Sequence, residues 1–125
     1  MHENDISYLI RKAAFTIHTA LGPGLLESVY ETLLRHELQK AGLAVECQVG
    51  LPVLYDGLRL ENGFRMDLVV ENAVVVELKS VETLLEVHHK QLLTYLKLSG
   101  HKLGLLINFN VPAIKDSIFR KVNGL

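Results

Sequence analysis

The feature that most constrains the fold is an uninterrupted apolar run, 73–76, which continues into Glu77-Leu78-Lys79. A run this apolar is typical of a central strand that is buried on both faces of a sheet. Side chains two residues apart in a strand point to the same face, so Glu77 and Lys79 share one face at the end of the run. Burying a charge is costly unless it is paired or bound to a metal. These two residues are therefore either a structural ion pair at the strand end or part of a functional site.

A further carboxylate, Asp67, interrupts the preceding apolar strand, 64–70. The turn-prone pair Glu71-Asn72 separates the two strands and predicts a hairpin. A loop of residues 71–73 would place Asp67 opposite Glu77 on the same face, whereas a loop of only 71–72 would place them on opposite faces. We predict the odd-length or bulged loop. Two carboxylates held close together repel each other unless a cation lies between them, and oxygen ligands favour Mg²⁺ or Mn²⁺.

The remaining periodicity predicts an α/β (α+β) chain in the order ααββββαβ, with a mixed sheet flanked by helices. The expected helices span 5–21, 26–41 and 86–99, and the expected strands span 44–55, 58–61, 64–70, 73–79 and 103–109. Asn4 or Asp5 is the expected cap of the first helix. Asp56-Gly57 is the expected hairpin turn, and Pro52 should lie at an edge or a bulge because proline has no N–H donor. No linker or repeat divides residues 1–125, which predicts a single domain.

The charge balance excludes a strongly basic protein that binds the phosphate groups of nucleic acid through a large excess of positive charge. Thirteen Lys and Arg residues stand against fourteen Asp and Glu residues, which gives a formal net charge of −1. The signs are unevenly spread, because residues 1–78 carry six basic and eleven acidic side chains and residues 79–125 carry seven and three. This asymmetry indicates either one basic face or a mixed, solvated surface.

The cysteine content and the N-terminus bear on location. A single cysteine, Cys47, forms no internal disulfide, and its alternating apolar neighbours indicate a small core residue. The N-terminus lacks the basic start and apolar run of a signal peptide, and no stretch is long enough to span a bilayer. We therefore expect a cytoplasmic protein without a membrane partner.

His88-His89 does not predict a zinc site, because adjacent side chains on a helix diverge.

Two motifs carry a resemblance to a known family. The spacing of Asp67, Glu77 and Lys79 across a hairpin resembles the signature of the PD-(D/E)XK nuclease superfamily, here without the leading proline. The segment 24–30, Gly-Leu-Leu-Glu-Ser-Val-Tyr, is similar to the name motif of the small bacterial GxxExxY proteins, which are placed in that superfamily. The likeness continues through 64–67, 76–79, 88–96 and 105–109 and so covers nearly the whole chain. It implies a restriction-endonuclease-like core.

The resemblance also implies a metal centre. Glu27, Asp67 and Glu77 would be carboxylate ligands of Mg²⁺ or Mn²⁺, and the backbone carbonyl of Leu78 would add a ligand. Lys79 would assist or orient the attacking water. From the residues alone, Glu27 lies at the margin of a helical apolar stripe, where its side chain could point either into the site or into water.

The predicted helix 86–99 contributes further candidate site residues. Gln91 and Tyr95 match the Q-x-x-x-Y motif of RecB-like nucleases, and their spacing of four places both on one helix face. His88 lies one turn before Gln91 and is a candidate phosphate contact. The other candidate phosphate contacts are basic residues of the C-terminal part: Lys90, Lys97, Lys102, Arg120 and Lys121. Tyr30 is predicted to have a structural role, as an aromatic residue at the edge of the core.

These observations predict a metal-dependent nuclease that hydrolyses phosphodiester bonds of DNA or RNA. The alternative is a catalytically silent module of the same fold that binds nucleic acid or protein. The leucine-rich helices are compatible with a homodimer and equally with leucines that fill a monomer core.

Overall fold

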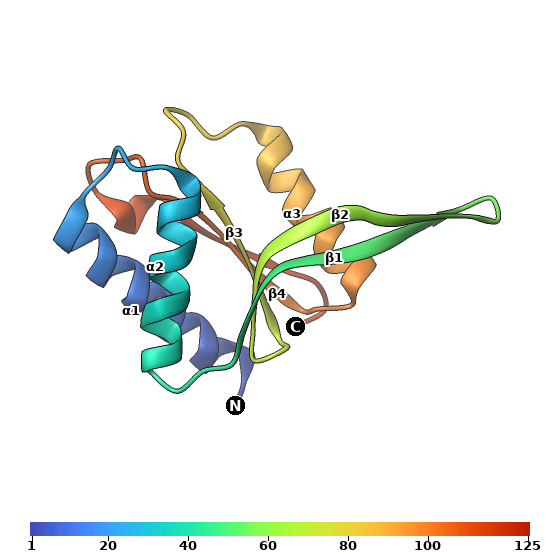
Figure 1. Cartoon of the computed structure of the whole chain (residues 1–125), viewed down its shortest axis with the longest axis horizontal. Helices are drawn as coiled ribbons and strands as arrows, with labels where there is room; N and C mark the ends of the chain where they lie inside the picture. Colours follow the sequence, from blue (N-terminus) through green and yellow to red (C-terminus); the bar gives the residue numbers. More distant parts are fainter.

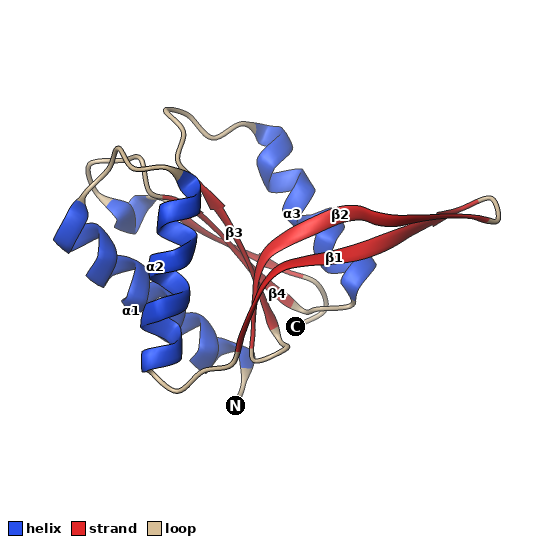
Figure 2. Ribbon diagram, in the orientation of Figure 1, coloured by secondary structure: helices blue, strands red, loops and turns tan.

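The computed structural model describes residues 1–125 and contains three α-helices, one short 3-10 helix and five strands (Figures 1 and 2). The helices are α1 (Glu3–Leu21), α2 (Glu27–Lys40) and α3 (Glu86–Ser99), with η1 (Ile114–Asp116) near the C-terminus. The strands are β1 (Val45–Tyr55), β2 (Leu58–Val70), β3 (Val74–Lys79), β4 (Leu103–Asn108) and β5 (Ile118–Val122). None of the helices combines the length and the apolar content that a membrane-spanning helix requires.

The five strands form one mixed sheet in the order β1-β2-β3-β4-β5. β3 and β4 are parallel and all other neighbours are antiparallel. Because parallel strands need a crossover connection, α3 joins β3 to β4 across one face of the sheet. α1 and α2 lie on the opposite face (Figure 1). The restriction-endonuclease-like α+β fold class is therefore confirmed, with β3 as the central strand.

Burial of β3 explains why its sequence is apolar on both faces. Val74, Val76 and Leu78 belong to the core under α1 and α2, whereas Val75 belongs to the core under α3. All four side chains are fully buried. By the same alternation, Glu77 and Lys79 project on the α3 face of the sheet.

The predicted order ααββββαβ is wrong in two places. The expected strands 58–61 and 64–70 are one continuous strand, β2, because β1 pairs with it on both sides of Asn62-Gly63. The register shifts between Leu51 and Val53, so Pro52 lies at an irregularity on an edge strand, as predicted. The second difference is the C-terminal strand β5, which pairs with β4 and was missed.

The helices also differ in detail from the predicted ranges. α1 begins earlier than expected, because His2 and not Asn4 or Asp5 is its cap, with its Nδ1 accepting from the Asn4 N–H at 3.0 Å. α2 begins at Glu27, one residue later than predicted, and Leu26 before it is exposed. α3 has the predicted bounds, Glu86–Ser99.

The β1–β2 hairpin extends well beyond the body of the molecule (Figure 1). Its turn is Asp56-Gly57, as predicted, and both residues have positive φ. β2 pairs with β3 only where Leu68–Val70 faces Val74–Val76. Beyond this short ladder β2 follows β1 away from β3, so the sheet divides at Asp67 and Glu77.

Candidate active site

Asp67 and Glu77 lie at the point where β2 and β3 separate. The residues between Val70 and Val74 form the predicted odd-length loop, and Glu71 and Asn72 both have positive φ. Continuing the register by one step places Asp67 opposite Glu77. The two side chains do not share one face as predicted, because Asp67 lines a cavity on the α2 side whereas Glu77 follows Val75 on the α3 side. The Asp67 N–H donates to Glu77 Oε1 at 3.0 Å, and the Leu78 N–H donates to Asp67 Oδ2 at 2.8 Å. Each carboxylate therefore accepts a backbone N–H of the opposite strand where ladder bonds are no longer available.

Glu77 is the more unusual of the two carboxylates because only 5% of it is exposed. Burial raises the pKa of Glu77 to about 8, and the charge of Asp67 adds to the rise. Lys79 and the Asp67 N–H act in the opposite direction and do not cancel it. Glu77 therefore favours its protonated form near neutral pH, and a bound cation would favour its charged form instead.

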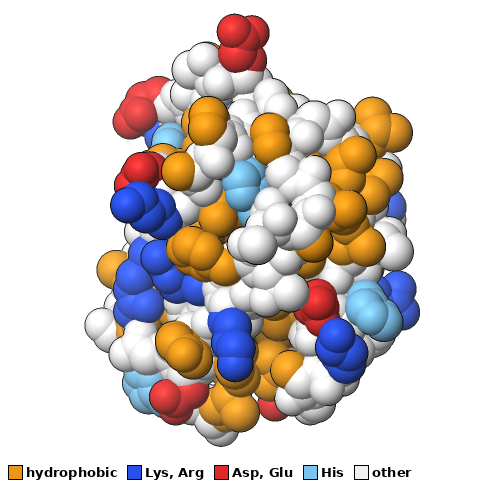
Figure 3. Space-filling view, turned by 90° about the vertical axis from the view of Figure 1, so that its left-hand side faces the viewer, with side chains coloured by type: hydrophobic (Ala, Val, Ile, Leu, Met, Phe, Trp, Pro, Cys, Tyr) orange, Lys and Arg blue, Asp and Glu red, His pale blue; other side chains and the backbone are white.

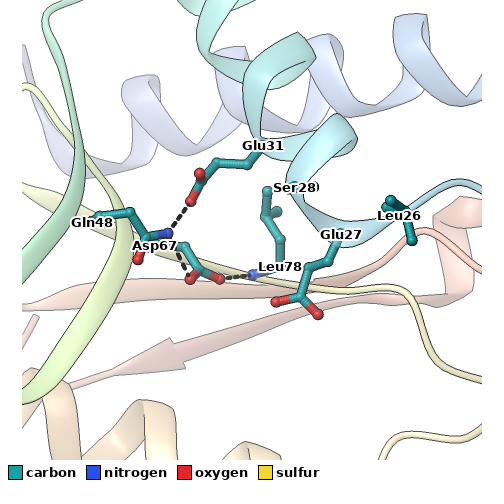
Figure 4. Close-up of a pocket in the computed structure, with 7 residues that line it drawn as sticks. All are labelled: Leu26, Glu27, Ser28, Glu31, Gln48, Asp67 and Leu78. Carbon is teal, nitrogen blue, oxygen red and sulfur yellow. Dashed lines mark hydrogen bonds between the residues drawn. The ribbon is translucent and has the colours of Figure 1, made fainter.

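A cavity of about 390 Å³ adjoins Asp67 on the side of α2. Figure 4 shows Glu27 and Glu31 entering it from α2, Gln48 from β1 and Asp67 from β2. The carboxylates of Glu27 and Asp67 point into the same space (Figure 4). Of the two orientations left open for Glu27, the structure has the one in which the side chain faces the candidate site.

Tyr30 fixes the loop that leads into α2. Its ring is fully buried and stacks on Phe109 with centroids 4.3 Å apart. Its hydroxyl donates to the Gly22 carbonyl at 2.6 Å and accepts from the Leu25 N–H at 3.3 Å. The predicted structural role of Tyr30 is confirmed, although the residue is in the core and not at its edge. By holding this loop, Tyr30 sets the position from which Glu27 starts α2.

The segment after Lys79 is anchored at two points. The Ser80 hydroxyl donates to the Leu25 carbonyl at 2.6 Å and so links β3 to the loop before α2. The buried side chain of Asn108 accepts from the Val81 N–H at 3.1 Å and donates to the Val81 carbonyl at 2.9 Å. These bonds hold the end of β3 in place between the two helical layers.

The carboxylates of α2 share the electrostatic environment of Asp67. Partial burial raises the pKa of Glu27, and Asp67 and Glu31 add to the rise while Lys79 opposes it. Partial burial also raises the pKa of Glu31, against the hydrogen bond from Gln48. Lys79 is thus the cation that acts on both Glu27 and Glu77.

Lys79, Gln91 and Tyr95 lie on the α3 side of the divided sheet. Lys79 and Gln91 line an open hollow of about 510 Å³ together with His88 and Lys90. Tyr95 is nearly buried and stacks on Phe64 at 4.6 Å. Burial raises the pKa of Tyr95, and the charges of Glu77 and Asp67 raise it further, so its hydroxyl stays protonated near neutral pH.

His88 has one ring nitrogen committed to the backbone. Its Nδ1 accepts from the Leu85 N–H at 3.1 Å, which in the neutral ring places the proton on Nε2. Desolvation lowers the pKa of His88, and Lys79 and His89 lower it further. A neutral His88 therefore has an N–H donor available beside Lys79 and Lys90.

The oxygen donors of the site suit a hard divalent cation, because carboxylate and carbonyl oxygens are the ligands that Mg²⁺ and Mn²⁺ prefer. Burial raises the pKa of Glu77, and a cation bound beside it would oppose this rise. As the side chains stand, no three His, Cys, Asp or Glu residues converge in the arrangement of a metal site. The ligand set Glu27, Asp67, Glu77 and Leu78 therefore stays a prediction.

Among the cavity residues that were not predicted from the sequence, Glu31 and Gln48 are the two whose side chains hydrogen-bond to each other. Glu31 lies one helical turn after Glu27, so the spacing of four was an available signal. Gln48 approaches Asp67 only through the pairing of β1 with β2. Two of the candidate phosphate contacts lie elsewhere. Lys97 does not line the hollow that contains Lys90, and the Arg120 side chain donates to Asn4 Oδ1 at 2.7 Å.

The charged side chains on the face shown in Figure 3 are not all of one sign. Figure 3 shows acidic and basic side chains interspersed over one face, with apolar side chains between them. This agrees with the formal net charge of −1. Positive charge at the site is supplied locally, by Lys79 and Lys90 in the hollow.

Comparison with known proteins agrees with this fold. A family model described as the PD-(D/E)XK nuclease superfamily matches residues 4–121. The chain therefore belongs to the PD-(D/E)XK nuclease superfamily. The fold is similar to the crystal structure of SSO0001, with 22% identity and a TM-score of 0.58. That similarity covers 98% of this chain and 60% of the SSO0001 chain. No match was found among curated proteins.

Proposed function

We propose that this protein is a divalent-metal-dependent nuclease that hydrolyses phosphodiester bonds of DNA or RNA. The observation that carries the proposal is the placement of Asp67 opposite Glu77, with Lys79 two residues further, where β2 and β3 separate. Membership of the nuclease superfamily supports the same activity. The finer likeness to the GxxExxY proteins remains part of the proposal.

Glu27, Asp67 and Glu77 would hold Mg²⁺ or Mn²⁺, together with the backbone carbonyl of Leu78. When bound, such an ion lowers the pKa of a water molecule and polarises a phosphodiester oxygen. The raised pKa values of Glu27 and Glu77 support this assignment, because each carboxylate gains a stabilising partner when a cation is present.

The chain's own cations and donors have separate tasks in this proposal. The Lys79 ammonium group stabilises the negative charge that develops on the phosphate and helps to orient the attacking water. Lys90, Gln91 and the Nε2–H of His88 bind phosphate oxygens in the hollow beside Lys79. The protonated Tyr95 hydroxyl is a further donor on this side. In hydrolysis the oxygen of the attacking water forms a new P–O bond, the P–O bond to the leaving oxygen breaks, and that oxygen takes up a proton, which leaves a phosphate monoester and a free hydroxyl.

The test is cleavage of single-stranded DNA, duplex DNA and RNA with Mg²⁺, with Mn²⁺ and with a chelator. We expect metal-dependent cleavage that falls by roughly 10²-fold or more in each of the variants Asp67→Asn, Glu77→Gln and Lys79→Met. Asp116→Asn is the matched control, because Asp116 is exposed and lies outside both cavities. Circular dichroism would establish that the variants are folded. Cleavage that survives in all three site variants would overturn the proposal.

The second candidate function is a binding module without catalysis. It is favoured by the reciprocal hydrogen bonds of Asp67 and Glu77, which give both carboxylates a structural role at the strand separation. Calorimetric titration of Mn²⁺ into the wild type and Asp67→Asn separates a metal site from a purely structural pair. Nucleic-acid binding without cleavage of any of the three substrates would favour the binding module.

A further inference from the structure

Gln48 has a backbone conformation that is unusual for its residue type. Its φ is 52° in the middle of β1, although it is not glycine. Left-handed φ values are uncommon for such residues outside turns, and strained backbone of this kind is found at functional sites. The side chain of Gln48 is exposed, so burial of that side chain does not account for the conformation.

The conformation coincides with a change of face in both strands of the hairpin. In β1, Cys47 packs against the core under α1 and α2, whereas Val49 packs against the core under α3. In β2, Leu68 belongs to the first core and Met66 to the second. Residues two apart should share a face. Both strands therefore rotate at the same level, which is the level of Gln48 and Asp67.

The rotation brings the Gln48 amide between two carboxylates. Its Nε2 donates to Glu31 Oε1 at 2.5 Å and lies 3.5 Å from Asp67 Oδ1, at the outer limit of a hydrogen bond (Figure 4). The amide group has two N–H donors, so it can serve both carboxylates at once. Asp67 thus has Oδ2 held by the Leu78 N–H and Oδ1 held by Gln48.

The strand rotation alone does not require glutamine. Glycine adopts left-handed φ without steric cost, and asparagine tolerates it better than glutamine does. The backbone conformation therefore does not explain why residue 48 is glutamine, and its side chain needs a functional explanation. Its amide is the neutral donor between Glu31 and Asp67.

We propose that Gln48 is a positioning residue. Its side-chain amide holds the Asp67 carboxylate in the orientation that binds the divalent cation, and it keeps the Glu31 carboxylate apart from the Asp67 carboxylate. This inference rests on the proposed metal-dependent nuclease function. It predicts that the side chain of Gln48 contributes to metal affinity and turnover, whereas its backbone conformation reduces the stability of the fold.

The key variant is Gln48→Gly, because it relieves the left-handed backbone and removes the amide. We expect its melting temperature without metal to rise by about 2–6 °C. We expect its Mn²⁺ affinity by calorimetry to fall about 3- to 10-fold, in the range of the loss seen when groups that orient metal ligands are removed. The kcat for nucleic-acid cleavage should fall with the KM nearly unchanged. Gln48→Asn, which keeps a shorter amide, should recover part of the Mn²⁺ affinity.

The matched control is Asn62→Gly. Asn62 also has φ of 52°, but it lies in the projecting part of β2 and does not line the cavity. Its variant should keep the wild-type Mn²⁺ affinity and kcat. Wild-type Mn²⁺ affinity and kcat in Gln48→Gly would overturn the role of Gln48 while leaving the proposed function intact. A wild type that neither binds Mn²⁺ nor cleaves would overturn both.

Discussion

The two faces of the sheet are unequal in buried apolar side chains, and the candidate site lies where they meet, with Glu27 and Asp67 on the α2 side and Glu77 and Lys79 on the α3 side. The face under α1 and α2 has a core cluster of 20 buried residues, whereas the face under α3 has a cluster of 7. Most apolar burial, and hence most of the hydrophobic stabilisation, lies on the first face. Glu77 and Lys79 project on the second, thinner face, where fewer packed side chains cover the end of β3.

The largest effect is expected from a core variant on the thick face. Leu34→Ala removes a fully buried side chain of α2 and should lower the free energy of unfolding by about 2–5 kcal/mol. Denaturation with urea measures this loss. Leu98→Ala is the control, because Leu98 is exposed on α3 and its variant should change stability by less than about 0.5 kcal/mol. Equal losses in the two variants would contradict the placement of Leu34 in the core under α1 and α2.

A pH-dependent effect is expected from Glu77 on the thin face. The pKa of Glu77 is raised from 4.5 to about 8 by burial and by Asp67, so the folded protein keeps a proton that the unfolded chain releases. The contribution of Glu77 to stability is therefore lost as the pH rises from about 4.5 to 8. Without divalent cations, Glu77→Gln should be more stable than the wild type at pH 8, by at least about 1.4 kcal/mol, which corresponds to one pKa unit.

The measurement is the urea midpoint of both proteins between pH 4.5 and 9. The difference should be small at the acid end and grow as the pH rises. Glu61→Gln, at an exposed position in the hairpin, should follow the wild type throughout. Parallel curves for the wild type and Glu77→Gln would contradict the raised pKa.

A smaller effect on the thick face is expected from the Tyr30 hydroxyl. Tyr30→Phe keeps the stacking on Phe109 but loses the bonds to the Gly22 carbonyl and the Leu25 N–H. We expect a loss of about 1–2 kcal/mol in the free energy of unfolding. Mn²⁺ affinity should fall as well, because the loop before Glu27 loses its anchor. The exposed Tyr8 offers the control Tyr8→Phe, and unchanged stability in Tyr30→Phe would show that the loop does not depend on the hydroxyl.

The smallest effect is expected in the hollow beside α3. Lys90→Gln removes one candidate phosphate contact and should weaken nucleic-acid binding about 2- to 5-fold. The slope of log affinity against log salt concentration should fall by about 0.7–0.9, the value for one phosphate contact. Fluorescence anisotropy at several salt concentrations measures both quantities. Lys115→Gln, at an exposed position in η1, is the control, and an identical slope in the two variants would exclude a contact by Lys90.

Much of the central part of the fold was predictable because its signals are local. The apolar run before Glu77 indicated a strand buried on both faces, and the turn residues 71–73 predicted the register that opposes Asp67 and Glu77. The bounds of α3 followed from its periodicity and from Gly100, which ends the helix in the left-handed conformation. The continuity of β2 could not be predicted from local signals, because pairing with β1 is what holds Asn62-Gly63 within the strand.

By itself, the sequence determined which side chains have chemistry to contribute, since the types and spacing of Asp67, Glu77 and Lys79 are local properties. Only the tertiary structure decided which distant residues join them. Counting back from the Asp56-Gly57 turn places Gln48 opposite Arg65, but the irregularity between Leu51 and Val53 shifts the register and brings Gln48 opposite Asp67. Burial of Glu77, which raises its pKa, likewise depends on the packing of α3 and β2 against β3. These outcomes depend on pairing between segments far apart in the chain, which residue spacing within one segment does not encode.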